Sequence, residues 1–233
     1  MRKLEAEKLL AAARAVEEVE DGMLVGLGSG RTAAHAIRLL ARRMAEGLRF
    51  RGAATSLGTE ALARSLGIEL VELESMSRLD LAIDGADEID PRLRAVKGRG
   101  GAFLREKLVA AASDRVIAIV DSSKPVEELG RAPLPVEALP FARSYVESAL
   151  GRLGASVTLR TGADGLPFVT DQGGHVFDLG FGRIEDPGAL AAALDAIPGV
   201  AGHGLFLTEI DAMVIGRDGA AELVERSQQR WRP

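Results

Sequence analysis

The fold of this chain is decided by Met23-Leu24-Val25-Gly26-Leu27-Gly28-Ser29-Gly30-Arg31-Thr32. The apolar residues at its start predict a strand, and the glycines that follow predict a loop. Beyond the loop, apolar residues recur at helical spacing at Ala33, Ala36, Ile37, Leu40 and Met44. A strand, a glycine loop and a helix in this order are typical of an anion site, because backbone N–H groups and the helix dipole favour phosphate. A tight turn with a helix cap is the alternative interpretation.

The flanking sequence repeats this alternation of helix and strand. Upstream, apolar residues have helical spacing at Leu9, Ala12, Ala13, Val16 and Val19. Downstream, we expect strands at 50–54, 68–73, 79–83 and 116–120, and helices at 60–66 and 102–112. Helices that alternate with apolar strands favour a doubly wound, mostly parallel sheet. We therefore predict an α/β fold. Its larger domain consists of residues 1–130 and 205–233, and the second of these segments is expected to contain strands at 205–208 and 212–215.

The character of the sequence changes after residue 130. Pro133, Pro135 and Pro140 indicate a crossover between domains. The following segment predicts helices at 143–153 and 189–196, and strands at 156–160, 168–170 and 176–179. We assign residues 131–204 to a second, smaller α+β domain, and we expect the polar tail 227–233 to be frayed.

Composition excludes several classes of function. The chain has 233 residues with 29 basic and 34 acidic side chains, so a net charge of −5 argues against a nucleic-acid partner. The absence of cysteine excludes disulfides, thiolate metal sites and a cysteine nucleophile. No stretch reaches the ~18 apolar residues of a membrane span, and the start has no signal-peptide pattern. We expect a cytoplasmic protein without a membrane partner.

A second apolar strand runs directly into acidic residues at Asp84-Gly85-Ala86-Asp87. Ligands of open α/β sheets bind beyond the carboxyl ends of the strands, so these carboxylates suit sugar hydroxyls or a divalent metal. A solvated acidic turn is the alternative. The three histidines, His35, His175 and His203, have no ligand spacing, so we predict no metal site.

Two further strand ends carry cations. One is a glycine loop, Lys97-Gly98-Arg99-Gly100-Gly101, which precedes a helix that has Glu106 about one turn from its start. The other, Asp121-Ser122-Ser123-Lys124, follows the strand at 116–120. Alone, Glu106 would be an ordinary solvated residue between Arg105 and Lys107. The shared placement of these segments at strand ends indicates a small, phosphorylated, polyhydroxylated substrate.

A dinucleotide site is the competing interpretation of the first loop. Gly28, Gly30 and Ala33 match the dinucleotide fingerprint loosely, but that site requires an acid roughly 20 residues later. No acidic residue lies between Gly47 and Thr59. A dinucleotide-dependent oxidoreductase is therefore disfavoured.

Taken together, these segments resemble type A ribose-5-phosphate isomerases over nearly the whole chain. The resemblance is carried by Val25–Gly30, Asp84–Glu88, Lys97–Gly101 and Leu104–Lys107, and extends to Pro133–Glu137, Thr170-Asp171 and Ile197–Val200. It implies a Rossmann-like domain with a smaller α+β domain, and a homodimer or homotetramer. It also implies interconversion of D-ribose 5-phosphate and D-ribulose 5-phosphate in the pentose phosphate pathway, without a cofactor.

The same resemblance implies roles for individual residues. Glu106 is the general base, which acts through an enediolate, and Asp84 and Lys97 complete the catalytic set. The substrate-binding set is Lys8, Ser29, Gly30, Arg31, Thr32, Asp84, Gly85, Ala86, Asp87, Lys97, Gly98, Arg99, Gly100 and Lys124.

The chain departs from the family pattern at three places. Arg31 replaces a serine, Arg99 interrupts a glycine loop, and Gln172-Gly173-Gly174 replaces Asn-Gly-Asn. Whether Arg31 and Arg99 contact the phosphate or point away stays open. A non-catalytic sugar-phosphate sensor is disfavoured, because no DNA-binding extension or basic patch is evident.

Overall fold

A computed structural model describes residues 2–226, so the predicted frayed tail at 227–233 lies outside the described residues. The chain forms two compact units. The first contains 2–86, 105–125 and 208–226, and the second contains 87–104 and 126–207. The segments 87–104 and 126–130, which are predicted from the sequence to belong to the larger domain, thus cluster with the second unit. Within the described residues, no helix is long and apolar enough to cross a membrane.

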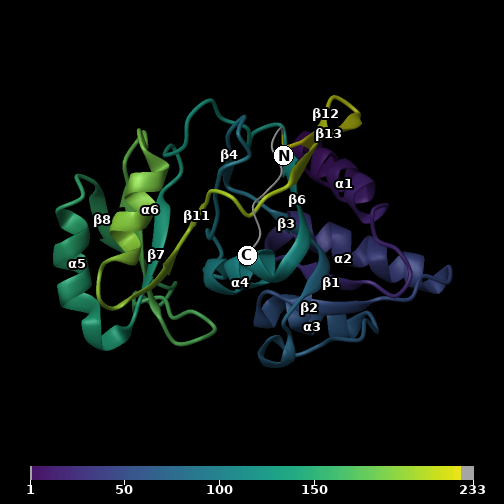
Figure 1. Cartoon of the computed structure of the whole chain (residues 1–233), viewed down its shortest axis with the longest axis horizontal. Coiled ribbons are helices and arrows are strands. Elements are labelled where there is room, and N and C mark those ends of the chain that lie inside the picture. The colour runs from purple at the N-terminus through teal and green to yellow at the C-terminus, as the bar shows by residue number, and fades with distance from the viewer. Residues whose placement is uncertain (1, 227–233) are drawn as a thin grey trace. The chain divides into compact units, whose positions relative to one another are not determined.

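The first unit is built on a six-stranded sheet (Figure 1). Five strands run parallel: β1 (Leu24–Leu27), β2 (Arg51–Ala54), β3 (Leu79–Gly85), β6 (Ser113–Asp121) and β12 (Ala212–Arg217). β13 (Ala220–Glu225) pairs antiparallel with β12 at one edge, giving the order β13-β12-β6-β3-β1-β2. The predicted mostly parallel sheet is confirmed.

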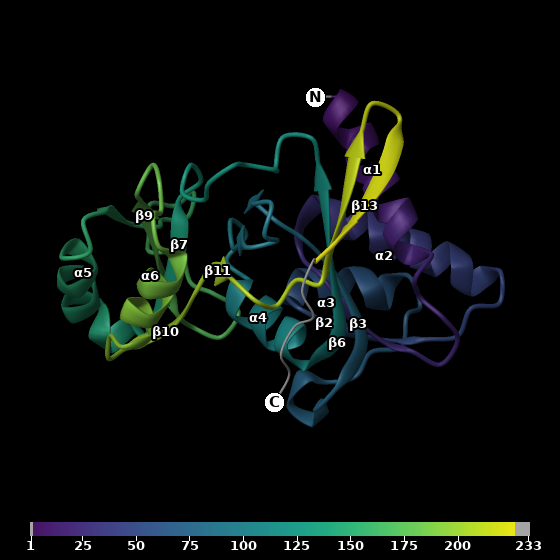
Figure 2. The same cartoon turned by 45° about the horizontal axis from the view of Figure 1, so that its top comes forward.

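Side-chain alternation along the strands buries both faces of this sheet. Leu27 and Ile83 share one core with residues of α1 (Arg2–Val16), α2 (Gly30–Ala45) and α3 (Leu57–Ser65). Gly26 faces the other way, where a Cβ would lie 2.4 Å from Val109 of α4 (Phe103–Ala112). Helices therefore cover both faces, as a doubly wound fold requires. Figure 2 shows the β12–β13 hairpin, in yellow, beside α1.

The second unit contains two antiparallel sheets. One has the order β10-β7-β9-β8 and the other the order β11-β5-β4. The strands are β4 (Glu88–Ile89), β5 (Ala95–Val96), β7 (Leu134–Ala138), β8 (Ser156–Leu159), β9 (His175–Gly180), β10 (Val200–His203) and β11 (Leu205–Phe206). The helices are α5 (Arg143–Gly151) and α6 (Pro187–Asp195), and short 3-10 turns occur at Leu73–Ser75 and Pro140–Ala142. Leu134, Val136 and Phe177 lie in its core.

Two strands predicted from the sequence do not form, and a third forms but pairs in the second unit. The segments 68–73 and 168–170 form only isolated bridges, Gly52 to Leu70 and Val169 to His175, because the chain turns away at each after one pairing. The strand predicted at 205–208 for the larger domain is β11, which pairs with β5 in the second unit.

The predicted crossover at the prolines contains a central strand, β7. Its ladder with β10 covers only Val136, Glu137 and Ala138, so Pro135 lies beyond that ladder. Pro135 pairs with Asp178 of β9, but its carbonyl accepts from the Gly204 N–H on the opposite side, so its nitrogen also faces away from β9 and no ladder hydrogen bond requires an N–H there.

Candidate active site

The glycine loop after β1 lies against the end of β3. The Gly28 N–H donates to the Ile83 carbonyl at 3.0 Å, and the Ser29 N–H donates to Oδ1 of Asp84 at 3.0 Å. Oδ1 also accepts from the Gly85 N–H at 2.7 Å. Asp84 is buried, so these backbone donors fix its carboxylate at the carboxyl end of the sheet.

A cluster of hydroxyl groups supports this loop. Oγ of Ser29 lies 2.7 Å from Oγ1 of Thr55, 2.9 Å from Oγ of Ser56 and 3.2 Å from Oγ1 of Thr59. Thr59 in turn donates to the Gly28 carbonyl at 2.9 Å. These three partners were not predicted from the sequence, although Ser56 and Thr59 have the spacing of a helix N-cap and its N3 residue.

The start of α2 leaves its N–H groups available to a ligand. Ser29 occupies the N-cap position, but its side chain makes no capping hydrogen bond, and the first turn carries no acidic residue. The first four N–H groups of a helix have no acceptor within the helix. Thr32 is half-buried near Gly85, whereas Arg31 is 82% exposed, with Nη1 3.8 Å from Glu5. These features fit the predicted anion site, and they place the Arg31 side chain beside an acid.

Glu106 lies in the first turn of α4 and is only 7% exposed. Its neighbours Arg105 and Lys107 are half-buried. The ordinary solvated position that the local sequence suggests is therefore wrong. A carboxylate buried near the positive end of a helix is suited to proton transfer.

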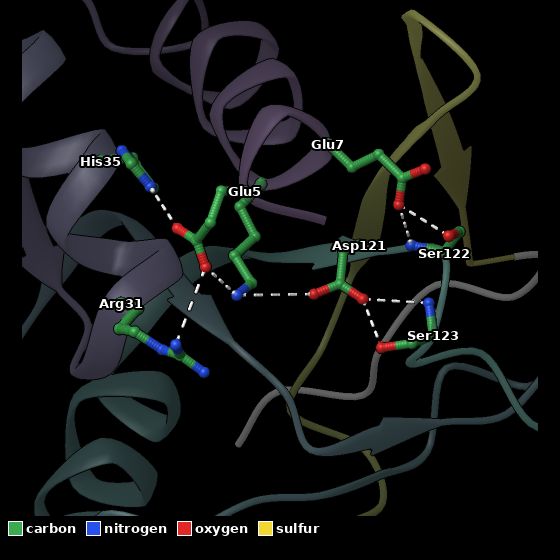
Figure 3. A network of polar contacts seen from close by, with 8 residues as sticks. Glu5, Glu7, Arg31, His35, Asp121, Ser122 and Ser123 are labelled. Atoms are coloured by element: carbon green, nitrogen blue, oxygen red, sulfur yellow. Dashed lines mark hydrogen bonds and ion pairs between the residues drawn. The ribbon is translucent and has the colours of Figure 1, made fainter. Parts of the chain in front are cut away.

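Polar residues of α1 meet the end of β6 (Figure 3). Nζ of Lys8 lies 2.6 Å from Oε1 of Glu5 and 4.0 Å from Oδ2 of Asp121. Oε2 of Glu7 accepts from the Ser122 hydroxyl at 2.6 Å and from the Ser122 N–H at 3.1 Å. The hydroxyl donor is the main reason why the pKa of Glu7 lies below its ordinary value. This network positions the turn that carries Lys124, whose N–H donates to the Asp121 carbonyl.

In the second unit, Asp87 holds the glycine loop at 97–101, the lysine loop. The Asp87 N–H donates to Val96, and its Oδ2 accepts from the Arg99 N–H at 3.0 Å. Nζ of Lys97 lies 5.3 Å from the centroid of the Phe206 ring, and Lys97 is buried. The Arg99 side chain is exposed. Asp87 thus shapes the backbone of the loop, and Phe206 is a contact that was not predicted from the sequence.

Arg160, which was not predicted from the sequence, also contacts the lysine loop. Its Nη1 donates to the carbonyl oxygens of Gly98 at 3.1 Å and Arg99 at 3.2 Å. The other side of the guanidinium pairs with Asp178. Nε donates to Oδ2 at 2.9 Å, and Nη2 donates to Oδ1 at 2.5 Å. Gly98 needs to be glycine, because its φ is +106° and a Cβ would lie 2.5 Å from Phe103.

The predicted site residues divide between the two units. Asp87, Lys97, Gly98, Arg99 and Gly100 lie in the second, and the first contains Lys8, Ser29, Gly30, Arg31, Thr32, Asp84, Gly85, Ala86, Glu106 and Lys124.

Among residues 2–226, no three acidic or histidine side chains form a group able to hold a metal ion. His203 is buried, where its Nδ1 accepts from the Leu205 N–H.

Comparison with known proteins decides the family. The model of the family described as ribose 5-phosphate isomerase A (phosphoriboisomerase A) matches residues 51–219. The chain belongs to this family. The ribose-5-phosphate isomerase A of Sphingopyxis alaskensis is 54% identical over 223 residues, which cover 96% of this chain and 97% of that protein. The corresponding protein of Thermomicrobium roseum is 49% identical over 226 residues, which cover 96% of this chain and 95% of that protein.

Solved structures of ribose 5-phosphate isomerases have the same fold. The enzyme from Methanocaldococcus jannaschii has a TM-score of 0.89 at 36% identity, covering 94% of this chain and 97% of that chain. Another, a D-ribose-5-phosphate isomerase in complex with phospho-erythronic acid, has a TM-score of 0.93 at 35% identity, covering 96% and 99%. The family resemblance, the α/β fold class and the isomerase class predicted from the sequence are thereby confirmed.

Proposed function

We propose that this chain interconverts D-ribose 5-phosphate and D-ribulose 5-phosphate through an enediolate, with Glu106 as the base that carries the proton. The substrate follows from the names of the relatives. The assignment of the base depends on one observation, the burial of Glu106 in the first turn of the helix that the lysine loop opens.

Isomerisation moves a proton between C2 and C1 of the open-chain sugar. One carboxylate suffices if it removes the proton from C2 and returns it to C1. Such general-base catalysis typically contributes ~10²–10⁴ in rate. Glu106 suits this role because burial brings the protonated and ionised forms of a carboxyl closer in free energy.

The other residues stabilise charge and hold the sugar. In this proposal, Lys97 and N–H groups of its loop stabilise the enediolate oxygen, where one such donor is worth roughly 10²–10³ in rate. Asp84 exchanges protons with the ring and anomeric oxygens during ring opening. Asp87 holds hydroxyl groups of the substrate.

The phosphate is held at a distance from the reacting carbons. The N–H groups at the start of α2, together with Lys8 and Lys124, supply the positive potential that a dianion requires. Binding energy from the phosphate then fixes C1 and C2 against the base. The Ser29 hydroxyl, whose partners are Thr55, Ser56 and Thr59, contributes by holding the loop.

A cofactor-free assay of ribulose 5-phosphate formation tests this function. Wild type and Glu106→Gln are compared, with Glu147→Gln, an exposed glutamate of α5, as the matched control. We expect Glu106→Gln to lose turnover by at least about a hundredfold while it still binds phospho-erythronic acid. Near-normal kcat in Glu106→Gln would contradict the assignment of the base.

Three further statements belong to the same proposal. The enzyme acts in the cytoplasm in the pentose phosphate pathway, needs no cofactor and assembles as a homodimer or homotetramer. Activity is therefore expected to survive exhaustive EDTA treatment, and light scattering is expected to give two or four chains. Activity lost to EDTA and restored by one metal, or a monomeric mass, would contradict these statements.

A further inference from the structure

Basic side chains from two helices converge on the carboxylate of Glu5 (Figure 3). Nζ of Lys8, from α1, lies 2.6 Å from Oε1. Nη1 of Arg31, from α2, lies 3.8 Å from the same oxygen. Nε2 of His35, one turn further along α2, lies 3.4 Å from Oε2. The carboxylate of Glu5 thus contacts all three of these basic side chains.

The partners differ in how firmly the fold holds them. The Lys8 side chain is 8% exposed, whereas that of Glu5 is 43% exposed. A buried ammonium group needs an anion nearby, because it has lost much of its hydration. The pKa of Glu5 is lowered, first by the hydrogen bond from Lys8 and then by that from His35, so Glu5 is an anion at neutral pH. Glu5 is the partner able to swing into solvent while Lys8 stays in place.

We propose that Glu5 is a resident counter-ion, which the phosphate group of the substrate displaces from Lys8, Arg31 and His35. This inference rests on the proposed function and adds His35 and Glu5 to the phosphate subsite. It also gives Arg31 a role, as a cation beside the phosphate.

Charge and geometry favour such an exchange. A phosphate monoester carries a charge near −2 and three acceptor oxygens, whereas a carboxylate carries −1 and two oxygens. Arg31 and His35 are four residues apart and lie on the same side of α2. The first turn of α2 has no acidic residue of its own, so its N–H groups add to the attraction for a dianion.

The exchange has a measurable consequence. A phosphate that enters must break the contacts of Glu5 with its basic neighbours, so Glu5 lowers the affinity of the site for anions. A partly exposed ion pair contributes only modestly to the free energy of the state that contains it. Loss of the competition from Glu5 therefore corresponds to about a two- to fivefold lower Kd for phosphate.

The test compares Glu5→Gln with Glu18→Gln, whose carboxylate pairs with Arg14 at 2.7 Å and contacts none of the three basic residues. Calorimetric titration with inorganic phosphate is expected to show Kd about two- to fivefold lower in Glu5→Gln, with a parallel decrease in KM for ribose 5-phosphate. Glu18→Gln is expected to match wild type in both. His35→Asn is expected to raise the Kd for phosphate by a similar factor.

Two results would overturn the inference. Unchanged phosphate affinity in Glu5→Gln would show that Glu5 does not compete, and weaker binding would show that it instead holds Lys8 in place for the substrate. Glu5→Ala serves as a second variant with the same expected direction if the amide disturbs packing. Wild-type protein that fails to isomerise ribose 5-phosphate would contradict the proposed function, whereas an active wild type with either result above would contradict this inference alone.

Discussion

Gly28 lies so close to Asp84 that a methyl group on its Cα would be 2.1 Å from the carboxylate oxygen Oδ1. The same oxygen accepts the Ser29 N–H, so the end of β1 and the end of β3 are joined through one carboxylate. The glycine loop after β1 and a proposed catalytic acid are therefore in direct contact, at a distance that only a glycine permits.

Gly28→Ala is expected to displace Asp84 and to destabilise the fold by about 1–3 kcal/mol, as overpacking in a tight interior does. Urea unfolding monitored by circular dichroism measures the loss, and kcat/KM is expected to fall as well. Gly151→Ala is the control, because a Cβ there meets nothing within 4 Å. Equal unfolding midpoints for the two variants would contradict the close contact.

Lys97→Ala is expected to lower kcat more than it raises KM, because the ammonium group is proposed to act on charge that develops in the transition state. Steady-state kinetics with ribose 5-phosphate separate the two effects, and about a hundredfold loss in kcat is expected. An unchanged kcat with a raised KM would make Lys97 a residue that binds the ground state.

Arg160→Lys is expected to reduce kcat/KM about tenfold, because an ammonium group cannot bridge Asp178 and two carbonyl oxygens as the guanidinium does. The thermal unfolding midpoint is measured in parallel. An unchanged midpoint indicates that only the lysine loop has shifted, whereas a lower midpoint indicates that the second unit is destabilised. Arg152→Lys provides the control, since Arg152 is exposed and bonds only within α5 and its end. If both variants keep full kcat/KM, Arg160 does not position the lysine loop.

Glu7→Gln is expected to reduce stability at neutral pH, and this effect is expected to disappear only as the pH falls below the ordinary pKa of 4.5 and through the lower pKa of the folded chain. The pKa of Glu7 is lowered in the folded chain, chiefly by the Ser122 hydroxyl. A lowered pKa contributes stability that is present above the unfolded value and is lost as pH falls through the folded value. The difference in urea midpoint between wild type and variant should therefore stay nearly constant from pH 7 to about 5 and shrink as the pH falls further below 4.5. A difference independent of pH would indicate that packing, and not charge, explains the effect.

Local patterns in the sequence were sufficient for most of the first unit. Short apolar segments and helical spacing indicated its parallel strands and its helices, because each element buries residues with the period of its own geometry. Patterning was less informative in the second unit. Its central strand β7 contains Pro135, and the two-residue strands β4 and β5 are too short to show any period.

By itself, the sequence determined the α/β class, the glycine loops and the identity of the residues that follow the strands, since these depend on composition and local spacing. Only the tertiary structure decided that Glu106 is buried, that Thr55, Ser56 and Thr59 surround Ser29, and that Arg160 holds the lysine loop. It also decided that Glu5 faces Lys8, Arg31 and His35 together. Burial and contacts between distant residues arise when separate elements pack, and no local period in the sequence records which side chains then meet.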